Sequence, residues 1–165
     1  MGAPSTGKTT LCKALAEKFE TKWMPEYGRE YWEKHHTNRR LTPEQLVDIA
    51  EGHIERENEL LNEANRFLFV DTNAITTFIF ALYYHQSAHP RLEELAKRAE
   101  TRYDRVFLCN TDIPYDDTWC RSGEANREDM QRWTVEQLTQ RKIPYVELPA
   151  NHEERMRLVE GHLHS

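Results

Sequence analysis

The chain has 165 residues, a formal net charge of -6, 38% hydrophobic and 30% charged residues. This length predicts one domain, residues 1–165, with one hydrophobic core. An acidic chain without a Lys/Arg cluster is a poor candidate for binding nucleic acid or an anionic membrane. We find no signal peptide and no apolar stretch long enough to span a bilayer, and Cys12, Cys109 and Cys120 form no disulfide framework. We therefore expect a reduced, cytoplasmic protein.

The first nine residues contain a phosphate-binding motif. Gly2-Ala3-Pro4-Ser5-Thr6-Gly7-Lys8-Thr9 matches G-x-x-x-x-G-K-[ST] at every fixed position. Its glycines let the backbone wrap tightly with its N–H groups directed inward, where they can hold triphosphate oxygens. Helical spacing follows the motif, which favours this reading over the alternative of a plain helix cap. The residues expected to bind the nucleotide are Gly2, Pro4, Ser5, Thr6, Gly7, Lys8, Thr9 and Thr10.

A strand is expected before this motif. A phosphate loop joins a buried strand to a helix, and only Met1 precedes Gly2 in the given sequence. We therefore expect the first, central strand of the sheet to be lacking, either because the start is assigned too late or because the sequence is a fragment. Such a chain is expected to be marginally stable, since each buried Val, Ile or Leu contributes roughly 1.5–3 kcal/mol.

The rest of the chain alternates strands with helices. Apolar runs predict strands at residues 21–25, 67–70, 105–109 and 143–148. Thr42, Pro43 and Gln45 are typical of a helix start. The buried face of that helix is expected to include Leu46, Ile49, Ala50, His53, Ile54, Leu60, Leu61 and Ala64. Further helices are expected at residues 75–85, 91–101, 127–140 and 152–162. This order predicts an α/β fold, the P-loop three-layer sandwich with a parallel sheet.

An aspartate follows the strand at residues 67–70. Asp71 in this position is typical of a magnesium site completed by the Thr9 hydroxyl; the alternative is that Asp71 caps the next helix. Thr72 stands where ATP-hydrolysing proteins of the extended AAA type usually have Glu, and the sequence contains neither D-x-x-G nor N-K-x-D. Phosphoryl transfer to a bound hydroxyl is therefore favoured over hydrolysis.

A kinase also needs an acceptor pocket and a lid. At the end of the strand expected at residues 21–25, Glu26 could accept the proton of an acceptor hydroxyl, and Tyr27, Tyr31 and Trp32 could stack on a flat ring. The alternative is that these aromatic residues pack the core. Residues 117–123, with Arg121, are the lid candidate together with Arg127; the alternative is a solvated loop. An arginine brought onto the transferring phosphoryl group stabilises its charge.

The motifs resemble one family. Gly2-Ala3-Pro4-Ser5-Thr6-Gly7-Lys8-Thr9-Thr10-Leu11, Pro25-Glu26-Tyr27-Gly28-Arg29-Glu30-Tyr31, Phe69-Val70-Asp71-Thr72-Asn73-Ala74-Ile75-Thr76-Thr77 and Arg121-Ser122 occur in this order. Together they resemble the nicotinamide riboside kinase domain of the bacterial bifunctional NAD-biosynthesis regulator.

The resemblance implies ATP-dependent phosphorylation of the ribose 5′-hydroxyl of nicotinamide riboside, with ATP and Mg²⁺ as cofactors. It implies catalytic roles for Lys8, Glu26, Asp71 and Arg121, and Mg²⁺ ligation by Thr9 and Asp71. The residues expected to bind substrate are Glu26, Tyr27, Arg29, Tyr31, Thr72 and Asn73, and Arg127 is expected to bind the nucleotide. Asn73 departs from the Asp often present in the family, which leaves the choice of substrate open.

Two other functions stay open. The chain could phosphorylate another nucleoside or small metabolite, or it could bind nucleotide as a non-catalytic regulator. The roles of Glu26 and Asp71 could also be exchanged. Aromatic faces and carboxylates would favour the positively charged ring of nicotinamide riboside.

Overall fold

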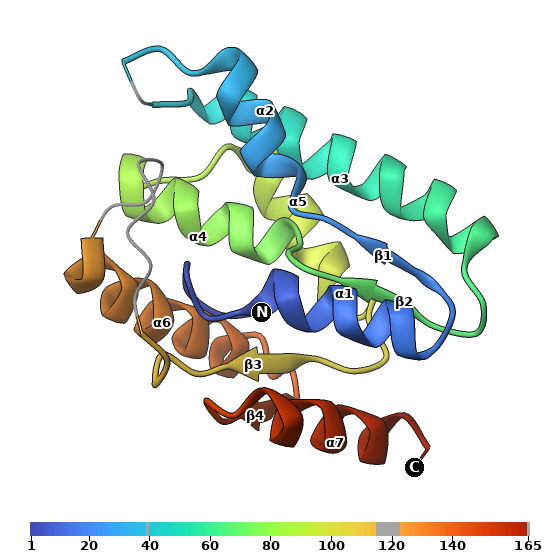
Figure 1. The fold of residues 1–165 in the computed structure, drawn as a ribbon. Coiled ribbons are helices and arrows are strands. Elements are labelled where there is room, and N and C mark those ends of the chain that lie inside the picture. Colours follow the sequence, from blue (N-terminus) through green and yellow to red (C-terminus); the bar gives the residue numbers. More distant parts are fainter. Residues whose placement is uncertain (39, 115–122, 165) are drawn as a thin grey trace. The chain divides into compact units, whose positions relative to one another are not determined.

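The computed structural model describes residues 1–38, 40–114 and 123–164. The chain forms two compact units, one made of Met1–Leu11 with Tyr103–Ser165 and the other of Cys12–Arg102. Each unit contains a pair of parallel strands (Figure 1). Helix α1 (Lys8–Lys18) begins in the first unit, directly after the phosphate loop, and continues into the second.

The unit Cys12–Arg102 contains strands β1 (Lys22–Met24) and β2 (Leu68–Val70). They pair in parallel, with Met24 opposite Val70. Four further helices belong to this unit: α2 (Tyr27–His35), α3 (Pro43–Glu63), α4 (Ala74–His85) and α5 (Pro90–Ala99). Helix α3 contacts both strands and the three other helices, so it is the centre around which this unit packs.

The start of α3 is the one that the sequence predicts. The backbone N–H of Gln45 donates to the Thr42 hydroxyl at 3.2 Å, and the Gln45 side chain accepts from the Thr42 N–H at 2.9 Å, which completes a capping box. Leu46, Ile49 and His53 are buried as expected. Leu61, expected on the same face, is 53% exposed, so that part of the prediction is wrong.

Helix α2 is not predicted by the sequence. Its nine residues are mostly polar or aromatic and lack an apolar stripe of helical spacing, so local pattern gives no signal. Contacts with α3 hold it instead. Arg56 pairs with Glu30 at 2.7 Å and lies over the Tyr27 ring at 4.1 Å, and the Tyr31 hydroxyl donates to Asp48 at 2.8 Å.

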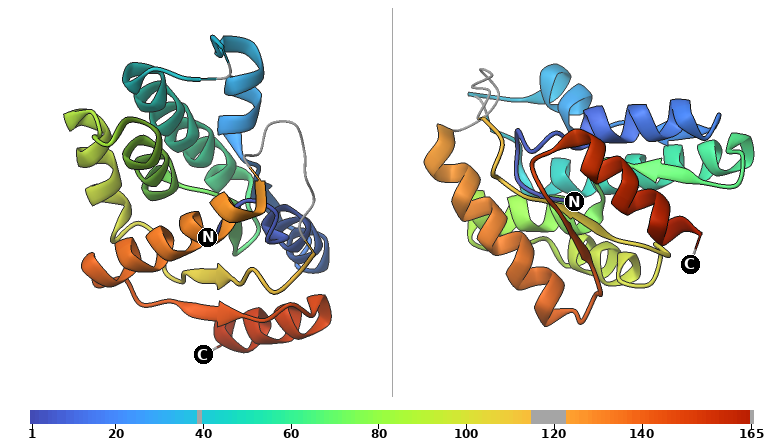
Figure 2. Two further views of the ribbon diagram at one scale, coloured as in Figure 1. Left: turned by 90° about the vertical axis from the view of Figure 1, so that its left-hand side faces the viewer. Right: turned by 60° about the horizontal axis from the view of Figure 1, so that its bottom comes forward.

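The other unit contains β3 (Phe107–Cys109), β4 (Val146–Leu148), α6 (Gly123–Gln140) and α7 (His152–Leu163). Strands β3 and β4 pair in parallel, and α6 and α7 flank them (Figure 2). On the other edge of β3, the Met1 nitrogen donates to the Phe107 carbonyl at 2.7 Å and the Met1 carbonyl accepts from Cys109 at 3.0 Å. The chain therefore enters the phosphate loop as a parallel neighbour of β3.

The predicted strands and helices are confirmed by position, with shorter strands than expected. Cys12 and Cys109 are free, buried thiols. Within residues 1–38, 40–114 and 123–164, no helix combines the length and the apolar character that crossing a membrane requires.

Gly52 makes room for Tyr27 in the middle of α3. A Cβ atom at Gly52 would lie 2.5 Å from Cε1 of Tyr27, whereas one at Gly161 in α7 would meet nothing within 4 Å. Gly→Ala in a helix normally stabilises by about 0.5–1 kcal/mol, but overpacking costs about 1–3 kcal/mol. The overpacking against Tyr27 outweighs the higher helix propensity of Ala. We therefore expect Gly52→Ala to lower the free energy of unfolding by about 1 kcal/mol in urea titrations.

The matched control is Gly161→Ala, which should leave stability unchanged or raise it. Equal stabilisation by both substitutions would contradict the close approach of Tyr27 to α3.

Candidate functional site

The phosphate loop adopts a conformation that requires its two glycines. Gly2 and Gly7 have φ of 133° and 77°, which L side chains rarely adopt. A Cβ at Gly2 would also lie 2.7 Å from the Cys109 carbonyl oxygen. At Gly7 it would lie 3.0 Å from Nη1 of Arg155. The positive φ angles and the lack of space for a Cβ atom therefore both explain why positions 2 and 7 are glycine.

Lys8 folds over its own loop. Its Nζ donates to the Ala3 carbonyl at 2.7 Å and lies 3.5 Å from the Thr6 hydroxyl, which itself donates to the Ala3 carbonyl at 2.9 Å. Lys8 also begins α1, whose first turn contains no acidic residue. The positive ammonium and the partial positive charge of the helix N-terminus thus coincide at this loop, an arrangement that attracts an anion.

Two side chains that the sequence analysis does not identify hold the loop from outside. Gln131 of α6 accepts from the Ala3 N–H at 2.8 Å and donates to the Cys109 carbonyl at 3.2 Å. Arg155 of α7 donates to the Thr6 carbonyl at 2.5 Å. No contiguous motif contains Gln131 or Arg155, and only the fold brings them to the loop.

Arg127, expected in the lid, lies buried in the same unit. Its Nη1 and Nη2 donate to the carbonyls of Ile113 and Thr111 at 3.0 and 2.7 Å. The guanidinium therefore orders the segment that follows β3. A role of Arg127 in nucleotide binding stays a prediction. Arg121, Cys120 and the other lid residues up to 122 lie outside the described residues.

In the unit Cys12–Arg102, the carboxyl ends of β1 and β2 bring Glu26 and Asp71 to one edge. The Asp71 N–H donates to the Met24 carbonyl at 3.1 Å, which extends the strand pairing by one step. Asp71 is 1% exposed. Glu26 is the N-cap residue of α2, but its side chain makes no capping hydrogen bond. Two carboxyl groups of different environments thus share this edge, as the sequence predicts.

Asn73, expected to bind substrate, caps α4. Its Oδ1 accepts from the N–H groups of Ile75 and Thr76 at 3.0 and 3.2 Å. The alternative in which Asp71 caps this helix is therefore wrong, and the Asp71 carboxylate is not used in that way. Asn and Asp are equally good N-caps, so the departure from Asp at position 73 preserves this structural role.

The predicted aromatic residues already have partners within their unit. Tyr31 is buried, stacks on His35 at 4.1 Å and donates to Asp48, and burial together with this hydrogen bond raises the pKa of Tyr31 to about 12. Trp32 stacks on His36 at 4.1 Å. Tyr31 therefore packs the core, as the alternative reading held. Arg29 is exposed and makes no hydrogen bond or ion pair with the described residues.

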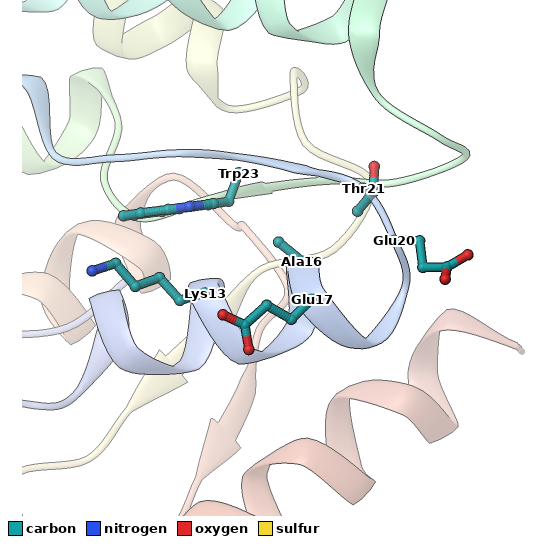
Figure 3. Close-up of a pocket in the computed structure, with 6 residues that line it drawn as sticks. All are labelled: Lys13, Ala16, Glu17, Glu20, Thr21 and Trp23. Atoms are coloured by element: carbon teal, nitrogen blue, oxygen red, sulfur yellow. The ribbon is translucent and has the colours of Figure 1, made fainter.

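Trp23 faces an open groove between α1 and β1. The groove has a volume of about 560 Å³ and is lined by Lys13, Ala16, Glu17, Glu20, Thr21 and Trp23 (Figure 3). Nζ of Lys13 lies 5.5 Å from the centre of the Trp23 ring. The next residue, Met24, is fully buried, so consecutive residues of β1 face the groove and the core.

A buried polar cluster lies behind the Asp71 edge. Arg102 donates to Glu57 at 2.8 Å, and Glu57 lies 3.5 Å from Nε2 of His53. Burial lowers the pKa of His53 to about 4; Arg102 and Arg56 lower it further, whereas Asp71 and a hydrogen bond with the Thr72 backbone oppose the shift. His53 is therefore neutral at pH 7, and its contact with Glu57 is not an ion pair there.

This pKa predicts a pH-dependent stability. Between pH 6.5 and about 4, the unfolded chain binds a proton on His53 that the folded chain does not, so the free energy of unfolding falls as the pH falls. From pH 6.5 to 5 the expected loss is roughly 1–2 kcal/mol. We expect urea unfolding at pH 7, 6 and 5, with EDTA present, to show this slope and His53→Gln to reduce it.

His152→Gln, at an exposed position, is the control and should keep the wild-type slope. The same slope in the His53 variant and in the wild type would show that another group causes the pH dependence.

Comparisons with known proteins agree with this fold and motif. The family described as AAA domain matches residues 1–155. The trifunctional NAD biosynthesis/regulator protein NadR of Escherichia coli (strain K12) is 31% identical over 150 residues, which are 88% of this chain and 36% of that protein. NadR of Salmonella typhimurium (strain LT2) is 32% identical with the same coverage. The chain thus spans about a third of the length of these curated relatives.

Solved structures share the fold. NadR in complex with NAD and AMP-PNP superposes with a TM-score of 0.78 at 23% identity, covering 100% of this chain and 48% of that chain. NadR in complex with NR gives 0.73 at 23% identity, covering 98% and 49%. Deoxyadenosine kinase from M. mycoides gives 0.63 at 12% identity, covering 99% and 96%.

These likenesses confirm the predicted α/β fold as that of P-loop kinases, and the family match extends over most of the chain. The chain therefore belongs to the AAA-domain family of P-loop proteins and is homologous to the matched segment of NadR, as its motifs predict.

Proposed function

We propose that this chain is an ATP-dependent kinase that phosphorylates the ribose 5′-hydroxyl of nicotinamide riboside to give nicotinamide mononucleotide. The observation that carries the proposal is the coexistence of a complete phosphate loop with a carboxylate edge formed by Glu26 and Asp71. Homology to NadR supports the choice of substrate, since NadR has been solved with AMP-PNP and with NR.

In the proposed reaction, the ribose 5′ oxygen attacks the γ-phosphorus of ATP. The new P–O bond forms as the bond between the γ-phosphorus and the β,γ-bridging oxygen breaks, ADP leaves, and the 5′-hydroxyl proton passes to the Glu26 carboxylate. Glu26 suits this role because its side chain makes no hydrogen bond or ion pair with the described residues. A positioned base of this kind contributes ~10²–10⁴ in rate.

Lys8 is proposed to bind the β- and γ-phosphates, and Arg121 to stabilise the charge of the transferring group, with Arg127 on the nucleotide. The Thr9 hydroxyl and the Asp71 carboxylate are proposed Mg²⁺ ligands, because both are oxygen donors of the kind Mg²⁺ prefers. Bound Mg²⁺ supplies neutralisation of the triphosphate charge. Compensation of this charge is what phosphoryl transfer needs most from a protein.

The acceptor is proposed to bind beside Glu26, with Tyr27, Arg29, Tyr31, Thr72 and Asn73 around it. These residues belong to α2 and to the turn after β2, which start at the carboxyl ends of the paired strands. In parallel sheets, ligands bind at this end. The fold shared with deoxyadenosine kinase favours, as a second candidate, the phosphorylation of another nucleoside.

The function is tested by a coupled assay of ADP formation with ATP, Mg²⁺ and a panel of nucleosides that includes nicotinamide riboside. We expect turnover with nicotinamide riboside and its loss in Lys8→Ala, because the ammonium is the loop's only side-chain cation. Melting without nucleotide should change little, since among the described residues Lys8 Nζ forms hydrogen bonds with its own loop only.

Preferred turnover of another nucleoside would support the second candidate. ATP binding without product from any nucleoside would indicate a non-catalytic regulator, and equal turnover in Lys8→Ala would reject a kinase.

Separate substitutions distinguish the two carboxylates. We expect Glu26→Gln to lower kcat by at least ~10²-fold while the affinity for ATP stays nearly unchanged, because a base acts only in the chemical step. Asp71→Asn should instead raise the Mg²⁺ concentration that gives half-maximal rate. Both are measured as initial rates over a Mg²⁺ titration.

The matched control is Glu33→Gln, an exposed position of the same helix as Tyr27. A loss below tenfold in Glu26→Gln would exclude Glu26 as the base. Rescue of Glu26→Gln, and not of Asp71→Asn, by excess Mg²⁺ would indicate that the two roles are exchanged.

A further inference from the structure

Arg155 is a buried cation whose role no motif explains. It lies in the first turns of α7 and is 2% exposed. Burial of a guanidinium is costly, so a buried arginine normally has a carboxylate partner. Over residues 1–38, 40–114 and 123–164, Arg155 forms no ion pair, and its hydrogen bonds all go to backbone carbonyls. Its position is therefore determined by the backbone that it contacts.

The three carbonyls come from three separate segments of the same unit. Nη1 donates to Thr6 in the phosphate loop at 2.5 Å, and Nη2 lies 3.4 Å from the carbonyl of Asn110, which follows β3. Nε donates to Pro149, which follows β4. One planar guanidinium thus joins the phosphate loop to the carboxyl ends of both strands, and only an arginine has donors in this forked arrangement.

The bond to Thr6 determines the direction of the next amide. The C=O and the N–H of a trans peptide point in opposite directions, so a Thr6 carbonyl directed toward Arg155 directs the Gly7 N–H away from it. A phosphate loop binds oxygens through N–H groups on its concave side, and the carbonyls on its outer side must find other donors. Arg155 is that donor at the Thr6–Gly7 peptide.

Gly7 allows this approach. A Cβ at Gly7 would lie 3.0 Å from Nη1 of Arg155, closer than most Cβ contacts in proteins. The second glycine of the motif therefore serves both its own positive φ and the access of the guanidinium to the loop.

The positive charge of Arg155 also favours an anion in the phosphate loop. An arginine stays protonated at any pH at which the protein is folded, and a buried charge acts through a medium of lower effective dielectric constant than water. With no carboxylate paired to Arg155, its positive potential is available to an anion held by the loop.

We propose that Arg155 is a positioning residue of the phosphate loop, which holds the Thr6–Gly7 peptide in the orientation that binds phosphate and adds its buried charge to the attraction for a triphosphate. This inference rests on the proposed function, in that the loop must bind a nucleoside triphosphate. It goes beyond that function because it assigns part of the affinity to a residue of the last helix, far outside the motif.

The test compares three variants by calorimetric titration of the folded chain with ATP and with inorganic triphosphate. Arg155→Met removes both charge and donors and should weaken binding of both ligands at least tenfold. Arg155→Lys keeps the charge but cannot reach three carbonyls, and should weaken it by at least threefold. Arg157→Met, at an exposed position of the same helix, should stay within twofold of wild type.

A merely structural role would lower the melting temperature without changing the affinity of the folded chain for triphosphate. Wild-type affinity in folded Arg155→Met, or in Arg155→Lys should the Met variant not fold, overturns the proposal. Lys8→Ala distinguishes a failure of the proposed function from a failure of the role proposed for Arg155. If it too binds triphosphate as wild type does, the proposed function fails, whereas loss of binding in Lys8→Ala alone rejects only the role of Arg155.

Discussion

A loop that turns its N–H groups toward an anion turns its carbonyl groups away from it, and each of those carbonyls needs a donor once water is excluded. For the Ala3 and Thr6 carbonyls of this chain the donors are side chains. Lys8 and the Thr6 hydroxyl serve the Ala3 carbonyl, and Arg155 serves that of Thr6. Gln131 completes the arrangement by accepting from the Ala3 N–H. The conformation of the loop therefore depends on α6 and α7, which carry Gln131 and Arg155, as well as on the motif itself.

The dependence of the loop on side chains from α6 and α7 explains which parts of the site can be predicted from the sequence. The glycines, Lys8 and Thr9 are contiguous, and their roles follow from local backbone geometry, so the motif is visible without a structure. Gln131 and Arg155 are ordinary residue types on helices that the sequence does predict, but only the pairing of Met1 and β4 with β3 brings those helices to the loop. Long-range placement of this kind leaves no local signal.

The same distinction holds in the unit Cys12–Arg102. The capping box at Thr42 is local and is predicted, whereas α2 depends on contacts with α3 and is not. Leu61 has the right spacing for the buried face of α3 but lies near the end of the helix, where about half of its surface stays exposed. The role of Tyr31 in substrate binding stays a prediction, because the local pattern does not show that the Asp48 carboxylate and the His35 ring also engage its side chain.

The two units differ in the charges of the side chains that are proposed to bind ligands. The unit that contains the phosphate loop carries Lys8, Arg127 and Arg155, of which the two arginines are buried against backbone carbonyls. The strand ends of the other unit present Glu26 and Asp71, and the turn between them and α4 is held by the Asn73 cap and the neutral His53. Cationic groups suit a triphosphate, and carboxylates suit a metal ion, a hydroxyl proton and a positively charged acceptor. The phosphoryl transfer to a cationic nucleoside proposed above would use both sets, because the triphosphate requires cationic groups and the acceptor hydroxyl requires a base.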